Sequence, residues 1–323
     1  MPEFDVNYFL QRMFSEQADF ASLRDELWAF QYAQNPILRQ YADGINAPRP
    51  VSLPISFFKH FPLKNGDSWE PQTIFESSGT SGQTPSRHLV RDLQIYQQSL
   101  LSGFYHRFAE RQYRVFALLP SYLERQTSSL VYMSKHWMDT FGLPGSGFYL
   151  YNFDELQQGL YEASEAGEPI ILIGVAFALL DFVERFAMAL PADTIVIETG
   201  GMKGRKEEIV RSELHQILRQ GFGIPQIHSE YGMTELLSQA YTREDGRFVC
   251  PPWMRVHCTD IHLNTLLQPP GISGRLHIVD LANIHSCAFI ATDDIGRVYE
   301  DGSFEVLGRL DNAEMRGCSL MYV

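Results

Sequence analysis

The chain of 323 residues is 45% hydrophobic and 20% charged, which is enough for one large or two ordinary globular domains. Its 26 Lys and Arg residues are outnumbered by 39 Asp and Glu residues, and the formal net charge of -13 argues against bulk binding to nucleic acid or an anionic membrane. Four cysteines without a CxxC pair give no disulfide framework, and the charged start is not a signal peptide, so we expect a cytoplasmic protein with free thiols.

The first part of the chain has a helical pattern. Apolar residues recur at helical spacing between residues 5 and 41, and the pattern ends at Gly44 and the pair Pro48 and Pro50. Between residues 113 and 228, the runs RVFALL, PIILIG and TIVIE each precede a helical run. We expect these helices near residues 128–141, up to about residue 190, and over residues 206–220.

This alternation predicts a mostly parallel sheet covered by helices. Its most apolar run, residues 170–180, stops at Asp181 and is too short to span a membrane. After residue 248 the pattern changes to short strands with turn signals such as PPGISG and EDGS, which predicts a smaller β subdomain. The expected fold class is therefore α/β, with a helical segment and α/β core over residues 1–247 and a β-rich subdomain over residues 248–323.

Four short segments carry residues suited to chemistry, and the first is FESSGTSGQTPSRH. A β-rich run over residues 73–75 leads into small residues whose N–H groups can converge on an anion, with hydroxyls as further donors. It is not a Walker loop, and a flexible surface loop is an equally good interpretation. The candidate phosphate ligands are Ser77, Ser78, Gly79, Thr80, Ser81 and Gly82.

The second segment, ETGGMKG, follows the predicted strand TIVIE. Its paired glycines, Gly200 and Gly201, would let a flat ring lie against the backbone, although a plain helix-entry turn has the same composition.

In the third segment, SEYGMTE, each residue type suits one part of a nucleotide. Tyr231 offers a stacking face, Gly232 a close approach, Thr234 a phosphate donor and Glu235 a Mg²⁺ ligand. The alternative is a capping turn that starts a helix around Leu236.

The fourth segment comprises ATDDIGRV and FEVLGRLDNAEMRG. Asp293 or Asp294 could hold ribose hydroxyls and Arg309 could bind a phosphate or the ribose, while the alternative is tight β-hairpins. A separate group, Cys250, His257, Cys258 and His262, contains metal-ligand residue types, but without CxxC or HxxxH spacing it is better explained by small buried side chains.

In this order the four segments resemble the core motifs of the adenylate-forming superfamily. SSGTSG is similar to its phosphate loop, YGMTE matches its Tyr-Gly-x-Thr-Glu motif at each residue, and TDDIG resembles its Thr-Gly-Asp motif with Asp293 in place of Gly. GRLDNAEMRG resembles its hinge motif without the usual Lys. The resemblance covers residues 74–317, most of the chain.

Most members carry a small C-terminal domain with a catalytic lysine after the hinge motif, whereas this chain stops six residues after Gly317, so we expect that domain to be absent. This architecture resembles the LuxE-type acyl-protein synthetases. In that family an acyl-AMP made from a fatty acid and ATP is passed to a cysteine near the hinge motif, and then to a partner acyl reductase. Cys318 stands at the matching position.

The resemblance implies an ATP- and Mg²⁺-dependent ligase that activates a carboxylic, by resemblance fatty, acid and delivers it to a protein thiol, with an acyl reductase or acyl carrier as partner. It assigns the β and γ phosphates to the Ser/Thr residues between 77 and 81, with Arg87 in place of a lysine. It also assigns the α-phosphate to Thr234, Mg²⁺ to Glu235, adenine to Tyr231 beside Gly200 and Gly201, and the ribose to Asp294 and Arg309.

The missing lysine leaves open which group stabilises the α-phosphate, and Arg87, Arg309, Lys203 and a partner chain are the candidates. An acyl-CoA ligase, and a non-catalytic subunit that binds acyl groups or nucleotide, are the alternative functions. The intact YGMTE motif favours catalysis, because a scaffold does not need a metal-binding carboxylate beside a phosphate-binding hydroxyl.

Overall fold

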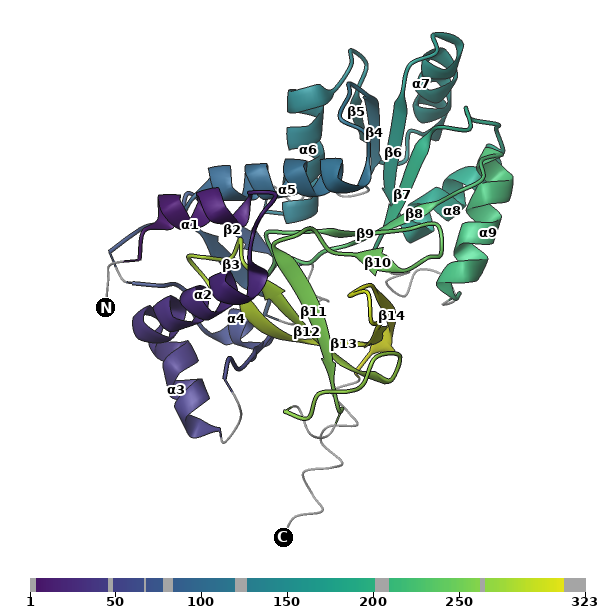
Figure 1. The fold of residues 1–323 in the computed structure, drawn as a ribbon. Coiled ribbons are helices and arrows are strands. Elements are labelled where there is room, and N and C mark those ends of the chain that lie inside the picture. The colour runs from purple at the N-terminus through teal and green to yellow at the C-terminus, as the bar shows by residue number, and fades with distance from the viewer. Residues whose placement is uncertain are drawn as a thin grey trace. The chain divides into compact units, whose positions relative to one another are not determined.

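A computed structural model describes residues 4–45, 49–66, 68–77, 84–119, 127–200, 209–261 and 265–310 (Figure 1). Its contacts divide the chain into two units. Unit 1 comprises residues 1–96, 235–238 and 249–323, and unit 2 comprises residues 97–234 and 239–248. The first 96 residues thus group with the C-terminal strands, whereas the sequence pattern places them with the α/β core.

Unit 2 is an α/β unit built on one sheet. In the described residues, the strand order is β5-β4-β6-β7-β8-β9, all neighbours being parallel except β8 and β9. Figure 1 shows these strands side by side, with α8 and α9 packed against each other. The strands are β4 (Arg114–Leu118), β5 (Gly147–Tyr149), β6 (Ile170–Val175), β7 (Ile195–Thr199), β8 (His228–Tyr231) and β9 (Ala240–Thr242). The helices are α5 (Leu93–Arg107), which begins in unit 1, α6 (Ser129–Phe141), α7 (Phe153–Glu165), α8 (Ala176–Arg185) and α9 (Arg211–Phe222).

The strands β6 and β7 are buried along their whole length, which is why they read as continuous apolar runs in the sequence. The prediction of strand and helix alternation is confirmed here, with shifted helix ends. The helix expected to reach residue 190 ends at Arg185, and the one expected over residues 206–220 begins at Arg211. Gly221 allows α9 to approach α8 closely, because a Cβ there would lie 2.7 Å from the Val183 side chain.

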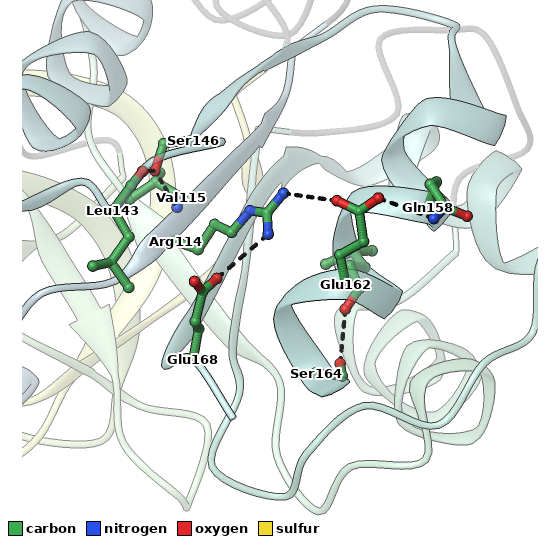
Figure 2. Close-up of polar contacts among 9 residues, drawn as sticks. Arg114, Val115, Leu143, Ser146, Gln158, Glu162, Ser164 and Glu168 are labelled. Carbon is green, nitrogen blue, oxygen red and sulfur yellow. Dashed lines mark hydrogen bonds and ion pairs between the residues drawn. The ribbon is translucent and has the colours of Figure 1, made fainter. Parts of the chain in front are cut away.

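A polar network holds the amino end of β4 (Figure 2). The guanidinium of Arg114 pairs with Glu162 of α7 at 3.3 Å and with Glu168 at 3.4 Å. Ser146 accepts from the Val115 amide at 2.9 Å and donates to the Leu143 carbonyl at 2.7 Å. These contacts lie at the amino ends of the strands. Open α/β sheets bind ligands at the carboxyl ends of their strands, so this network is not at the expected ligand position.

Unit 1 contains an antiparallel sheet of β11, β12, β13 and β14 in that order, with β1 parallel to β13. Figure 1 shows the purple N-terminal helices beside these green to yellow strands. The sheet strands are β11 (Met254–Thr259), β12 (Ser273–Asp280), β13 (Phe289–Val298), β14 (Phe304–Arg309) and β1 (Leu53–Pro54). A separate antiparallel pair consists of β2 (Thr73–Glu76) and β3 (Arg87–Val90), and β10 (Phe248–Val249) lies at the unit boundary. The helices are α1 (Val6–Met13), α2 (Phe20–Gln34), α3 (Pro36–Gly44) and α4 (Phe57–His60).

One buried glutamine explains why the N-terminal helices belong to unit 1. Gln31 of α2 donates to the carbonyls of Asn283 at 2.8 Å and Ile284 at 3.1 Å, and accepts from the amide of Ala288 at 2.9 Å. The predicted N-terminal helical segment is confirmed, but as three helices, since Asp19 and Asn35 cap the starts of α2 and α3. In the described ranges, no helix combines the length and apolar character needed to cross a membrane.

Candidate functional site

In unit 1, Glu235 is joined to the Ser/Gly segment by hydrogen bonds. The residue is 5% exposed, and a side-chain hydrogen bond with Ser86 is among the interactions that lower the pKa of its carboxyl. The Ser86 amide in turn donates to the hydroxyl of Ser77 at 2.8 Å, and the Ser77 amide donates to the Ser86 carbonyl at 3.1 Å. Residues 77 and 86 therefore close the base of the segment that the sequence predicts to bind phosphate, and connect it to the carboxylate of YGMTE.

The electrostatic surroundings of Glu235 include two cations. Burial raises the pKa of Glu235, whereas the Ser86 hydrogen bond and the positive charges of Arg309 and Lys59 oppose that rise. Arg309, whose side chain is 74% exposed, donates through Nε to the buried carboxylate of Asp294 at 3.0 Å. Unit 1 thus brings together four residues selected from the sequence, Ser77, Glu235, Asp294 and Arg309.

The two neighbouring aspartates of the fourth segment have different partners. Asp294 is opposite Arg309 in the register of β13 and β14. Asp293 pairs with Arg275 at 3.1 Å, and Arg275 is itself buried and donates to the carbonyl of Thr292. Asp293 is therefore paired with a buried arginine, whereas the carboxylate of Asp294 faces Arg309.

The cation proposed for the Ser/Gly segment lies on β3. Arg87 is exposed, and its Nε is 3.7 Å from the carboxylate of Glu76 on the neighbouring strand. Sequence reasoning did not select Lys59, on α4, or Ser86. Lys59 belongs to no motif, and the only signal for Ser86 was its position a few residues after the Ser/Gly stretch.

In unit 2, the residues selected for the adenine lie at the carboxyl ends of two parallel strands. Gly200 directly follows β7 and has a φ of 67°, and Tyr231 ends β8 and packs against Phe248 with ring centroids 5.7 Å apart. A Cβ at Gly232 would clash with the carboxylate of Glu230, so a larger residue there would require the Glu230 side chain to move. Residues 232–239 form neither helix nor strand, with a turn at residues 234 and 235, so the helix considered around Leu236 does not form.

Two polar pairs join the ends of β7 and β8. Glu198 is in register with Ser229, and Thr199 is in register with Glu230. Ser229 donates to the Glu198 carboxylate and lies 3.1 Å from Nε2 of His215, while Thr199 donates to Glu230 at 2.5 Å. These pairs fix the spacing of the two strand ends that precede Gly200 and Gly232. The amino-acid sequence did not predict these two pairs, because they depend on the register between β7 and β8.

We expect Glu230→Gln to stabilise the protein at about pH 8. Burial, together with the charge of Glu198, raises the pKa of Glu230 to about 7. Because the folded pKa lies above the unfolded one, stability is lost as the pH rises from about 4.5 through 7, and a neutral Gln avoids this loss. The gain should reach up to about 3 kcal/mol near pH 8 and stay under about 1 kcal/mol near pH 5.

Urea unfolding at the two pH values measures the difference. The control is Glu213→Gln, an exposed carboxylate on α9, which should change stability by less than about 0.5 kcal/mol at either pH. An equal gain for Glu230→Gln at both pH values would show that its carboxyl keeps an ordinary pKa.

Several selected residues lie outside the described residues. They are Ser78, Gly79, Thr80, Ser81, Gly82, Gly201, Lys203, His262 and Cys318. The other three cysteines are buried, and burial raises the pKa of Cys250 and Cys287 to about 12 and that of Cys258 to about 11. Among the residues that the structure describes, no three His, Cys, Asp or Glu side chains gather as a metal site.

The donor chemistry at Glu235 is compatible with Mg²⁺. This ion is commonly bound by one or two carboxylates together with substrate phosphates, rather than by a cage of protein ligands. Glu235 supplies one hard oxygen ligand, and its connection to Ser77 and Ser86 places that ligand beside the predicted phosphate segment.

Comparison with known proteins identifies relatives over nearly the whole chain. A family model described as "Acyl-protein synthetase, LuxE" matches residues 147–322. Two curated relatives are named long-chain-fatty-acid–luciferin-component ligase. The one from Aliivibrio fischeri is 24% identical and covers 95% of this chain and 89% of its own length. The one from Vibrio harveyi is 23% identical, with 91% and 84% covered.

Solved structures share the fold at low identity. A 2-hydroxyisobutyryl-CoA ligase in an open conformation, in complex with 2-HIB-AMP and CoA, has a TM-score of 0.67 and 10% identity over 94% of this chain and 77% of that chain. ATP-bound MatB from Rhodopseudomonas palustris has a TM-score of 0.55 and 18% identity over 73% of this chain. The match spans 47% of MatB, about half of its length. These likenesses confirm the predicted α/β fold class.

Proposed function

Because this chain belongs to the acyl-protein synthetase (LuxE) family, we propose that it uses ATP to convert a carboxylic acid into an acyl-adenylate and passes the acyl group to a protein thiol. The family model covers just over half of the chain. The names of both curated relatives specify a long-chain fatty acid, which makes a fatty acid the proposed substrate.

The observation that carries this proposal is the hydrogen-bonded connection from Ser77 through Ser86 to Glu235. In the adenylation step, a carboxylate oxygen of the acid forms a bond to the α-phosphorus, and the bond between that phosphorus and the β-phosphate bridging oxygen breaks to release pyrophosphate. The site must hold a triphosphate and an anionic acid in line, which requires hydroxyl donors and positive charge.

The selected residues divide this work. Glu235 ligates Mg²⁺, which when bound neutralises phosphate charge, and Thr234 donates to the α-phosphate. Ser77 and the following Ser and Thr residues bind the β and γ phosphates. Tyr231 stacks on adenine beside Gly200 and Gly201, and Asp294 with Arg309 holds the ribose hydroxyls.

Positive charge near the phosphates comes from Arg309 and Lys59. Both act electrostatically on Glu235, whereas Arg87 is already near Glu76. Arg309 and Lys59, both in unit 1, thus supply the positive charge that the catalytic lysine supplies in most members of the superfamily.

The second step transfers the acyl group to Cys318. The thiolate sulfur attacks the acyl carbon, a thioester forms, and AMP leaves with the electron pair of the broken mixed-anhydride bond. The three described thiols are buried with raised pKa values, which makes them poor nucleophiles and leaves Cys318 as the remaining cysteine. The proposed partner that takes the acyl group is an acyl reductase or an acyl carrier protein.

We expect fatty-acid-dependent exchange of labelled pyrophosphate into ATP, in the presence of Mg²⁺ and without CoA. A panel of straight-chain fatty acids, with benzoate as the aromatic arm, measures acid preference. ATP binding without exchange for any acid would support the non-catalytic alternative. Exchange followed by thioester formation only after CoA is added would support the acyl-CoA ligase.

A further inference from the structure

A buried carboxylate contacts the segment that carries Glu235. Asp280, at the end of β12, is buried completely. Its carboxylate accepts from the Leu237 amide at 2.8 Å, from the Ser238 hydroxyl at 2.6 Å and from the Ala282 amide at 3.1 Å. All of these residues belong to unit 1, which takes residues 235–238 from a stretch of chain otherwise assigned to unit 2.

The neighbouring Asn283 contacts Glu235 itself. Its Nδ2 donates to the Glu235 carbonyl at 2.9 Å. On the other side, the carboxylate of Glu235 accepts from Ser86. The backbone carbonyl of Glu235 is therefore held by Asn283, while its carboxylate interacts with Ser86 and with its own backbone amide.

Within the described residues, the side chain of Asn283 forms its hydrogen bond through its donor alone, as that of Asn65 does. Its Oδ1 is buried, and none of the described residues donates a hydrogen bond to it. A buried acceptor without a partner disfavours the folded state. What Asn283 contributes is thus its donor to Glu235, and replacing it should disturb the direction of Glu235 more than the stability of unit 1.

We propose that Asn283 and Asp280 are positioning residues, which hold the backbone of residues 235–238 so that the Glu235 carboxylate points at the metal bound to the nucleotide phosphates. This inference rests on the proposed function. It adds the residues that act through Glu235, and these belong to none of the four motifs seen in the sequence.

The test is metal affinity, measured apart from turnover. Mn²⁺ replaces Mg²⁺ as a paramagnetic probe, and α,β-methylene-ATP, which the enzyme cannot cleave to pyrophosphate, replaces ATP. Loss of a residue that orients a metal ligand typically weakens metal affinity by about 10- to 100-fold. We expect Asn283→Ala to raise the dissociation constant for Mn²⁺ in the nucleotide complex at least about tenfold, and to raise the Mg²⁺ concentration for half-maximal exchange in parallel.

A double-mutant cycle separates positioning from general damage. If Asn283 acts through Glu235, then Asn283→Ala made in a Glu235→Gln protein should produce little further loss of Mn²⁺ affinity. Asp280→Asn, which keeps the shape and removes the charge, should weaken Mn²⁺ binding in the same way. Should that variant fail to fold, the Asn283 cycle decides.

The matched control is Asn65→Ala. Asn65 is also a buried asparagine, and its Nδ2 donates at 2.5 Å to the carbonyl of Ile284, next to Asn283. None of the hydrogen bonds described for Asn65 reaches residues 235–238, so this variant should keep the wild-type Mn²⁺ affinity even where its melting temperature falls.

The outcomes are distinct. Wild-type Mn²⁺ affinity in Asn283→Ala overturns the inference, as does an equal loss in Asn65→Ala or an undiminished effect of Asn283→Ala in the Glu235→Gln protein. If the wild-type protein shows no Mn²⁺-dependent nucleotide binding, the proposed function fails and the inference fails with it.

Discussion

Glu235→Gln is expected to lower acid-dependent pyrophosphate exchange by at least about 10²-fold, the scale of losing one preorganised electrostatic contact. The amide keeps the size of the side chain and an oxygen that can accept from Ser86, but it lacks the negative charge that binds Mg²⁺. Rates measured over a range of Mg²⁺ concentrations should show that higher metal restores only part of the activity.

A control within the same unit is Glu305→Gln. Glu305 lies in the fourth segment, on the same strand as Arg309, but no role in nucleotide or metal binding is proposed for it, and its carboxylate accepts from the Tyr299 hydroxyl at 2.7 Å. This variant should exchange pyrophosphate at close to the wild-type rate. Near-normal exchange in Glu235→Gln as well would mean that Glu235 serves only the turn in which it lies.

Cys318→Ser is expected to abolish covalent labelling. Wild-type protein incubated with ATP, Mg²⁺ and labelled fatty acid should acquire a label that neutral hydroxylamine removes, because a thioester is cleaved under these conditions. The Ser variant should acquire none, since a serine hydroxyl at neutral pH is a much weaker nucleophile than a thiolate.

The control is Cys258→Ala, which removes a buried thiol and should label as the wild type does. Melting temperatures of both variants show whether either has lost its fold. A hydroxylamine-sensitive label that persists in Cys318→Ser would place the acceptor elsewhere and leave only the adenylation step of the proposed function standing.

The sequence predicted the elements of unit 2 well for a physical reason. Strands buried on both faces, such as β6 and β7, must be apolar throughout, and that signal is local. The grouping of the N-terminal helices with the C-terminal sheet was not predictable in this way. It depends on Gln31, a polar residue whose partners, Asn283 and Ile284, are remote in the sequence.

The same distinction applies to the candidate site. Tyr231, Glu235, Asp294 and Arg309 were selected because their residue types and spacing suit a nucleotide, and spacing can be read from the sequence. The residues that contact and support these four could not be identified from the sequence, because they act through pairing in three dimensions. Ser86 is joined to Glu235 through a contact between distant segments, and Thr199 meets Glu230 only through the register of β7 and β8.

The discontinuity of unit 1 has a consequence for how the chain folds during its synthesis. Gln31 and its partner Asn283 are 252 residues apart. At translation rates of about 5–20 residues per second, roughly 10–50 s pass between the appearance of one and that of the other. Throughout this interval Trp28 of α2 lacks Phe289 of β13, the ring that it packs against in the folded unit. Unit 2, whose segments are all made by residue 248, can assemble its sheet while unit 1 still waits for its last strands. Neither an amino-terminal nor a carboxyl-terminal fragment contains a whole unit 1, so a pause or premature stop late in translation leaves a folded α/β unit attached to exposed, aggregation-prone helices.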